Sequence, residues 1–152
     1  MGCTGSRGLG EFERDALESH NRYRKKHGAP PLRWSNECQR FARNWANHLA
    51  KTGKFEHGNH SGMGQNLGMV YGKEATGEGV TTMWYDEVQS YSFNNPSFQS
   101  NTGHFTQVVW KETKEFGIAK AVAKDGKVYM VGNYKPPGNV MNHFAENVER
   151  AK

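Results

Sequence analysis

The chain has 152 residues, a length that supports one hydrophobic core and favours a single domain. Its mean hydropathy is −0.89, and no apolar run reaches the roughly 18 residues that a membrane-spanning helix requires. The formal net charge of +5 is spread along the sequence. Because no zinc-finger spacing and no aromatic RNA-binding motif accompany it, nucleic acid is not an expected partner.

The first residues, Met1–Ser6, fit the N-myristoylation motif M-G-x-x-x-[ST]. Gly2 would carry an acyl chain on its α-amine after loss of the initiator methionine, and the neighbouring Cys3 would accept a second chain as a thioester. Two such signals give stable membrane anchoring, whereas one myristoyl chain binds reversibly. The motif therefore predicts a peripheral membrane protein; the alternative is an incidental leader sequence.

Cysteine usage and the amino terminus both bear on the cellular compartment. The sequence contains two cysteines, Cys3 and Cys38, and a disulfide between them is not favoured. The first residues lack the apolar segment of a secretory signal peptide. Together these features predict a reducing compartment. The densest basic run is Arg22, Arg24, Lys25 and Lys26, beside His27. It is interpreted as a solvated helix face, with attraction to anionic lipid as the alternative.

A flexible tail over residues 1–10 is expected to precede a single domain over residues 11–152. Apolar residues at helical spacing predict three helices in that domain. The expected ranges are 11–27, 35–51 and 74–91. Ser35 is a suitable N-cap for the second helix, and Gly53 is a suitable residue to end it.

The later part of the chain favours strands. A strand is predicted over residues 65–71, and two further strands over 116–124 and 127–134 are joined by Asp125-Gly126, a strong hairpin signal. The short apolar run at residues 105–110 is left unassigned because its periodicity fits neither state. Helices followed by a hairpin indicate an α+β domain with an antiparallel sheet.

Four segments resemble the signature motifs of the CAP superfamily, which comprises cysteine-rich secretory, antigen 5 and pathogenesis-related proteins. They occur in the family's order, and the resemblance covers residues 11–145. The segments are Gly64–Leu67, Met83–Glu87, Gly103–Trp110 and Val131–Asn139. The resemblance implies an α–β–α sandwich with a central antiparallel sheet.

The same resemblance implies a surface cleft lined by two histidines and two acidic residues. The matching positions here are His57, Gln65, Glu87 and His104. His60 is a second candidate for the first histidine, although the context of residues 55–57 favours His57. Gln65 stands where the family usually has glutamate. Gly132 stands where secreted members often have cysteine, which favours the family's intracellular branch.

The chemistry of this cleft follows from its residues. Two neutral imidazoles, His57 and His104, would hold a divalent cation such as zinc. Gln65 supplies neither charge nor a base, so Glu87 is the one carboxylate, and weak zinc binding is expected. No Gly-x-Ser-x-Gly elbow is present, and neither cysteine lies in a nucleophile motif. The other large motif residues are assigned structural roles: Trp84, Phe105 and Trp110 in the core, and Asn139 at a turn.

The resulting functional hypothesis is a non-enzymatic, membrane-associated CAP domain on the cytosolic face of the Golgi or other endomembranes. Expected partners are anionic membrane lipids or sterol, and protein partners, with a homodimer as a further candidate. One alternative is a zinc-dependent hydrolase that uses Glu87 as its base. Another is a secreted defence-type CAP protein, which the low cysteine count disfavours.

Overall fold

The computed structural model describes residues 9–58 and 62–152. Its helices are α1 (Glu11–Lys26), α2 (Asn36–Thr52), α3 (Gly77–Tyr85), the 3-10 helix η2 (Asp86–Ser90), α4 (Gly103–Val109) and α5 (Phe144–Asn147). Its strands are β1 (Arg33–Trp34), β2 (Gly64–Val70), β3 (Glu115–Val122) and β4 (Val128–Lys135). Three residues named by the sequence hypotheses lie outside the described residues: Gly2, Cys3 and His60.

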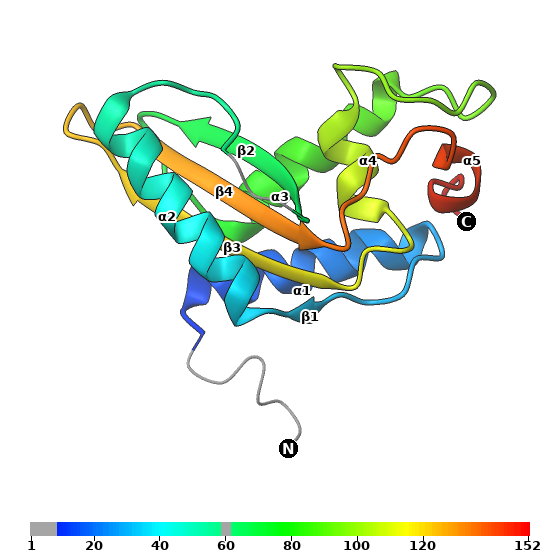
Figure 1. The fold of residues 1–152 in the computed structure, drawn as a ribbon, viewed down its shortest axis with the longest axis horizontal. Helices are drawn as coiled ribbons and strands as arrows, with labels where there is room; N and C mark the ends of the chain where they lie inside the picture. Colours follow the sequence, from blue (N-terminus) through cyan, green and yellow to red (C-terminus); the bar gives the residue numbers. More distant parts are fainter. Residues whose placement is uncertain (1–8, 59–61) are drawn as a thin grey trace.

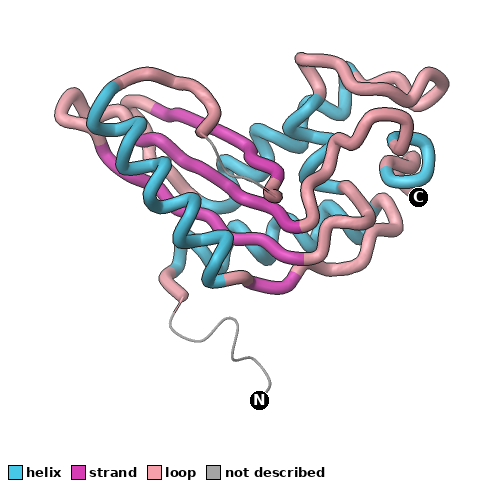
Figure 2. Tube along the Cα trace, in the orientation of Figure 1, coloured by secondary structure: helices cyan, strands magenta, loops and turns pink. Residues whose placement is uncertain are grey.

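The architecture is three-layered, as the sequence predicted. A four-stranded sheet in the order β1-β3-β4-β2 has α2 on one face, and α1 and α3 on the other (Figures 1 and 2). Alternating side chains of the strands fill two cores. In β4, Met130 and Tyr134 belong to the larger core beneath α1, α3 and α4. Val131 belongs to the smaller core, which packs against Ala46 and Leu49 of α2.

Local sequence explains the ends of the second helix. The hydroxyl of Ser35 accepts a hydrogen bond from the backbone N–H of Cys38 at 3.0 Å, which satisfies one of the donors left free at a helix N-terminus. Gly53 ends the helix with φ of 72°, a left-handed conformation that glycine adopts without steric cost. The predicted second helix is confirmed, and Cys38 is buried.

The third helix differs from its predicted range of 74–91. It begins at Gly77, after Thr76 caps its first turn through Gly79 N–H at 2.9 Å. The close approach of α1 explains Gly77, because a Cβ there would overlap the backbone of Phe12 and Ala16. After α3 ends, the chain tightens into η2 rather than continuing as α-helix.

The unassigned run at 105–110 is mostly α4. Its residues from Phe105 to Val109 are all buried, so one face does not differ from the other and no helical periodicity is visible in the sequence. From Phe105 onwards this helix is packed inside the molecule instead of lying on its surface.

The predicted hairpin of β3 and β4 is present. Ala123 N–H donates to Lys127 O at 2.8 Å, and Gly126 has φ of 93°, so the turn spans residues 124–126. The antiparallel sheet gains one strand that was not predicted: β1 pairs in parallel with β3 at the sheet edge. None of the helices in residues 9–58 and 62–152 is both long and apolar enough to cross a bilayer.

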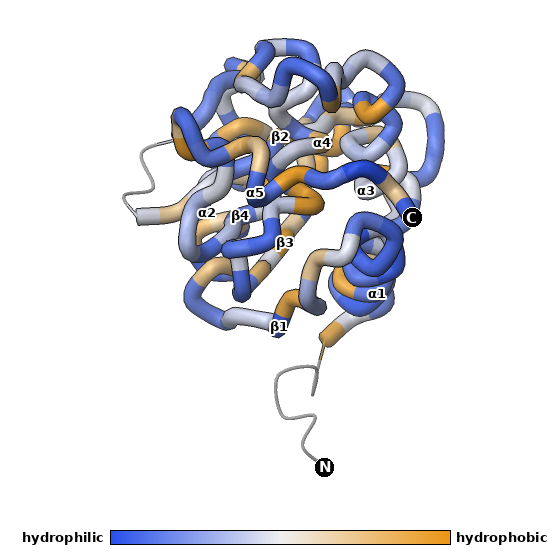
Figure 3. Tube along the Cα trace, turned by 90° about the vertical axis from the view of Figure 1, so that its right-hand side faces the viewer, coloured by the Kyte–Doolittle hydropathy of each residue, from blue (hydrophilic) through white to orange (hydrophobic). Residues whose placement is uncertain are grey.

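Helix α1 is largely hydrophilic in Figure 3, yet three of its polar residues are fully buried, Ser19, His20 and Arg24. Arg24 lies within the basic run interpreted above as solvated, so that interpretation is wrong at this position. Its guanidinium donates to four backbone carbonyls at 2.8–3.0 Å. Those carbonyls belong to Pro30, Val108, Trp110 and Thr113. Arg24 therefore ties α1 to the C-terminal end of α4.

Candidate functional site

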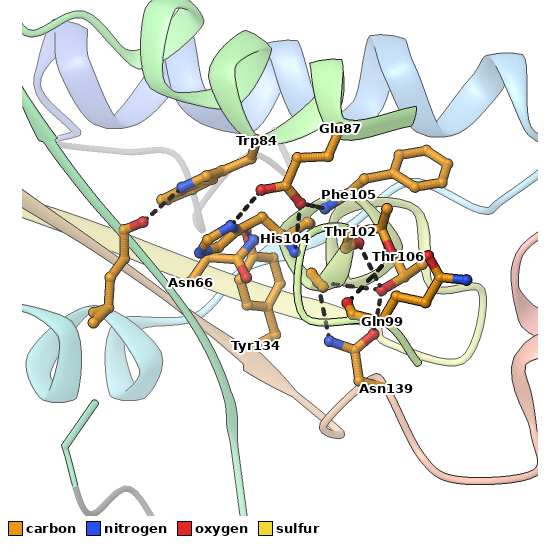
Figure 4. A network of polar contacts seen from close by, with 12 residues as sticks. Asn66, Trp84, Glu87, Gln99, Thr102, His104, Phe105, Thr106, Tyr134 and Asn139 are labelled. Carbon is orange, nitrogen blue, oxygen red and sulfur yellow. Dashed lines mark hydrogen bonds and ion pairs between the residues drawn. The ribbon is translucent and has the colours of Figure 1, made fainter. Parts of the chain in front are cut away.

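Glu87 and His104 form the first half of the candidate site (Figure 4). The Glu87 carboxylate accepts from His104 Nδ1 at 2.7 Å. Its other oxygen accepts from the backbone N–H groups of His104 and Phe105, at 2.9 and 3.1 Å. Thr102 occupies the N-cap position of α4 without a side-chain capping bond. Glu87 therefore caps α4 from η2 and fixes the helix that carries His104.

These contacts determine which nitrogen carries the proton in the neutral form of the His104 ring. An ionised carboxylate can only accept hydrogen bonds, so Nδ1 carries the proton, and the neutral imidazole has its lone pair on Nε2. The ring stacks on Trp84 with centroids 6.1 Å apart and 16° between planes, and the side chain is 34% exposed. His104 is thus held in one orientation and still accessible to a ligand.

A buried chain of hydrogen bonds supports the backbone of His104 from the core. Asn66 Nδ2 donates to His104 O at 3.2 Å and to the Tyr134 hydroxyl at 3.3 Å. That hydroxyl lies 2.7 Å from His20 Nε2. His20 Nδ1 is 2.9 Å from Ala16 O, an acceptor, so Nδ1 donates and Nε2 accepts from the hydroxyl. Burial lowers the pKa of His20 to about 3 and keeps it neutral.

His57 and Gln65 form the second half. His57 Nδ1 is 3.0 Å from Gln65 Oε1, and the same oxygen accepts from Gly58 N–H at 3.0 Å. A backbone N–H can only donate, so this atom is an acceptor and His57 Nδ1 must donate to it. In the neutral ring the lone pair is again on Nε2. The His57 loop is also tied to α2, because Trp45 Nε1 donates to Glu56 O at 2.8 Å.

The two halves lie on different faces of the sheet at β2. Gln65 Nε2 donates to Asn133 Oδ1 at 3.3 Å, on the α2 side, whereas Asn66 contacts Tyr134 on the α1–α3 side. Successive residues of a strand point to opposite faces, so two adjacent residues of β2 support the two histidines from separate layers. The hydrogen bonds join the four predicted residues as two pairs, each containing one histidine and one orienting side chain.

Metal-binding capacity is limited by the number of ligands. Within residues 9–58 and 62–152, no group of three or more His, Cys, Asp or Glu side chains is placed to hold a metal ion. A site built on the predicted residues would therefore depend on two imidazoles.

The structural roles assigned to other motif residues are confirmed. Trp84, Phe105 and Trp110 are buried in the larger core. Asn139, with φ of 58°, donates to Gly103 O at 3.0 Å and accepts from the Thr106 hydroxyl at 2.6 Å.

The supporting role of His20 was not predicted. Its one signal in the sequence is its position on the apolar face of the first helix.

Comparison with known proteins identifies relatives of this chain. Residues 17–134 match the model of the CAP cysteine-rich secretory protein family. The human Golgi-associated plant pathogenesis-related protein 1 is 43% identical over 143 residues, which cover 91% of this chain and 92% of that protein. Pathogenesis-related protein 1 of Arabidopsis thaliana is 31% identical over 132 residues, which cover 87% of this chain and 81% of that protein. Neither name states a catalytic activity.

Solved structures support the fold. The structure of NaASP2 with Zn2+ superimposes with a TM-score of 0.75 at 22% identity, covering 96% of this chain and 89% of that one. The structure of BmVAL-1 gives a TM-score of 0.77 at 20% identity, covering 100% and 88%. The family match spans most of the sequence and includes all four predicted cleft positions. This chain belongs to the CAP family of cysteine-rich secretory and pathogenesis-related proteins.

Proposed function

We propose that this protein is a non-enzymatic, membrane-associated CAP domain on the cytosolic face of the Golgi or neighbouring endomembranes, which binds a divalent cation such as zinc through His57 and His104. One observation carries the ion-binding part: both histidines use Nδ1 as a donor to a fixed acceptor, at 3.0 and 2.7 Å. A metal-binding histidine is commonly oriented in this way by a partner on its second nitrogen.

The residues fit zinc in kind but not in number. Neutral imidazole nitrogen is a preferred zinc ligand, and zinc polarises any water that it binds. Two protein ligands leave the remaining positions to solvent, which predicts weak and reversible binding. Gln65 orients His57 without adding a negative charge, so it does not offset the charge of the ion.

The state of Glu87 disfavours the hydrolase alternative. A general base must present a free oxygen to the water that it activates. Glu87 instead accepts three hydrogen bonds, two of them from the backbone of α4. Using it as a base would withdraw a capping interaction from the helix that holds His104. A binding role requires no such disruption.

The membrane part of the proposal is supported by two independent features. The sequence begins with an N-myristoylation motif that includes Gly2 and is followed by Cys3. The human relative that matches 91% of the chain is named as Golgi-associated. Anionic lipid is the partner favoured by the net charge of +5. Sterol, protein partners and homodimer formation stay predictions from the sequence.

Calorimetric titration with zinc chloride tests the ion site. The full chain and its His57→Ala and His104→Ala variants are compared with His143→Ala, which removes an exposed histidine paired with Glu146. We expect the first two variants to lose zinc binding and the control to retain it. Undiminished binding by both cleft variants would exclude the proposed ligands.

Intact-mass measurement of the chain from eukaryotic cells, followed by vesicle flotation, tests the membrane part. We expect an acyl mass on Gly2 and flotation with anionic vesicles, both abolished by Gly2→Ala. An unmodified amino terminus together with a chain that stays in the dense fraction would contradict membrane association.

A further inference from the structure

Exposed apolar side chains gather at the end of the sheet where the β3–β4 hairpin turns. Phe55, Tyr71 and Val122 are 54%, 65% and 67% exposed. Tyr71 follows β2 and lies against the hairpin turn, because a Cβ built on Gly126 would be 3.4 Å from its ring. Exposed aromatic and aliphatic groups gathered around one end of a sheet, even from both of its sides, are a candidate contact site.

Further contacts place these residues at one end of the molecule. Val122 and the last residue of β2, Val70, both pair with Val128 of β4. The ring of Phe55 lies 6.1 Å from that of Tyr129, the next residue along β4. The three exposed apolar residues therefore border the last rungs of the sheet.

Lysines lie close to these apolar residues in the sequence. Lys73 follows Tyr71, and Lys124 and Lys127 flank the tip of the hairpin. Asp125 is 3.6 Å from Lys127 and offsets its charge. Across the described part of the chain, neither Lys73 nor Lys124 is in an ion pair of 4.0 Å or less. We call Phe55, Tyr71, Val122, Lys73 and Lys124 the hairpin-end surface. Its acidic neighbours are Asp125, Glu74 and Glu56.

The start of α1 lies near this surface. Lys120, two residues before Val122 on β3, lies with its Nζ 4.8 Å from the centre of the Phe12 ring in the first turn of α1. The start of α1 and the hairpin turn are both toward the left of the molecule in Figure 1. The seven-residue step from Gly2 to Leu9 spans up to about 25 Å when extended. An acyl chain on Gly2 and the hairpin-end surface can therefore reach the same bilayer.

We propose that the hairpin-end surface is the face through which this protein contacts an anionic membrane, a proposal that rests on acylation of Gly2. Aromatic side chains are favoured at the boundary between headgroups and acyl chains, and lysines at the negative surface of a cytosolic leaflet. Tyr71, Phe55 and Val122 supply the apolar contact, and Lys73 and Lys124 the attraction to headgroups. The acyl chain and this surface act as two signals, which makes anchoring stable.

The exposed apolar residues at the other end of the molecule provide a matched control. Val140 and Met141 are 43% and 67% exposed, and they precede α5, which Figure 1 places far from the hairpin turn. Their surroundings include the acidic residue Glu146 beside His143. Substitution there removes similar apolar surface without affecting the hairpin-end surface.

The test uses acylated full-length chain and vesicles of phosphatidylcholine with or without phosphatidylserine. Binding of Tyr71→Ser/Val122→Ser and of Lys73→Gln/Lys124→Gln is compared with that of Val140→Ser/Met141→Ser. We expect each hairpin-end pair to weaken binding to the anionic vesicles by roughly tenfold or more, and the control pair to leave it unchanged. The lysine pair should have little effect on vesicles without phosphatidylserine.

The outcomes separate this inference from the function on which it rests. If acylated wild type fails to bind anionic vesicles, the proposed membrane function is wrong. If wild type binds and both hairpin-end pairs bind equally well, the acyl chain acts alone and the proposed face is wrong. If the control pair loses vesicle binding and the hairpin-end pairs do not, the membrane contact lies at the other end of the molecule. Hydrogen exchange of unsubstituted protein gives a second test: residues 122–128 should exchange more slowly on vesicles, and unchanged exchange there would overturn the proposal.

Discussion

Replacing Glu87 by glutamine should impair zinc binding without removing a zinc ligand. The glutamine oxygen can still accept from the two backbone N–H groups at the start of α4. Its amide nitrogen would then face His104 Nδ1, where the present N–O distance is 2.7 Å. Two N–H donors cannot share that contact, so the ring must move its proton to Nε2 and lose the lone pair that binds the ion.

The expected magnitude follows from the contacts that change. Removing a side chain that orients a metal-binding histidine typically costs 10- to 100-fold in metal affinity. Hydrogen bonds to charged groups contribute about 1.5–3 kcal/mol each, and two of the three survive in weaker, neutral form. Since the Glu87 side chain is 23% exposed, we expect Glu87→Gln to lower the free energy of unfolding by about 1–2 kcal/mol, and Glu87→Ala to lower it further.

The assay combines zinc titration, urea unfolding and NMR of the imidazole nitrogens. Wild type should show the proton of His104 on Nδ1, and the variant should show it on Nε2. Glu78→Gln removes the same charge from an exposed residue that pairs with Arg22, and it should leave zinc affinity unchanged. A Glu87→Gln protein with the wild-type tautomer and wild-type zinc affinity would refute the reasoning.

Three further predictions concern the supporting residues. Gln65→Glu should tighten zinc binding, because it keeps the acceptor for His57 and adds an anion; equal calorimetric affinities would show that position 65 does not act on the ion. Arg24→Met should lower the free energy of unfolding by about 3 kcal/mol or more, because it removes the donor to the carbonyls of Pro30, Val108 and Thr113, whereas Trp110 O still accepts from Thr113 N–H at 3.2 Å; a loss below about 1 kcal/mol in urea would contradict this. Burial lowers the pKa of His20 to about 3 and lowers that of His27, so protons bind first to the unfolded chain, whose histidines titrate near pH 6.5. The contribution of these histidines to the free energy of unfolding should therefore be complete above pH 6.5 and fall as pH drops towards 3, by up to about 1.4 kcal/mol per pH unit for each histidine. A constant free energy of unfolding between pH 6.5 and 5 would argue against neutral buried histidines.

Elements whose ends are marked by capping or turn residues were predictable from the sequence. Ser35 begins α2 and Gly53 ends it, both through contacts within or beside the helix itself. Asp125-Gly126 marks the hairpin turn. In contrast, α4 is buried on every face from Phe105 to Val109 and so lacks an amphipathic pattern. The two-residue strand β1 forms only because β3 is beside it. These two elements depend on contacts between distant parts of the chain, which local patterns do not record.

The candidate site likewise combines features visible in the sequence with features that depend on tertiary contacts. Resemblance to family motifs was sufficient to name His57, Gln65, Glu87 and His104, but it did not give their pairing. The carboxylate that caps α4 lies 17 residues before His104, so no capping motif is visible at the helix. Arg24 has the sequence context of a solvated cation, and only tertiary packing turns it towards buried carbonyls. Partnerships of this kind follow from the fold and not from spacing.

The division of the two histidines between layers has a mechanical consequence. Helix α1 is connected to His104 through His20, Tyr134 and Asn66, so movement of α1 against the sheet would displace His104. Movement of α2 is transmitted through Trp45 to the loop that carries His57. The distance between the two imidazoles therefore depends on how the helices on both faces of the sheet are positioned. In the proposed ion site, substitutions far from either ring, in the packing of a single helix, would therefore change the separation of the two ligands.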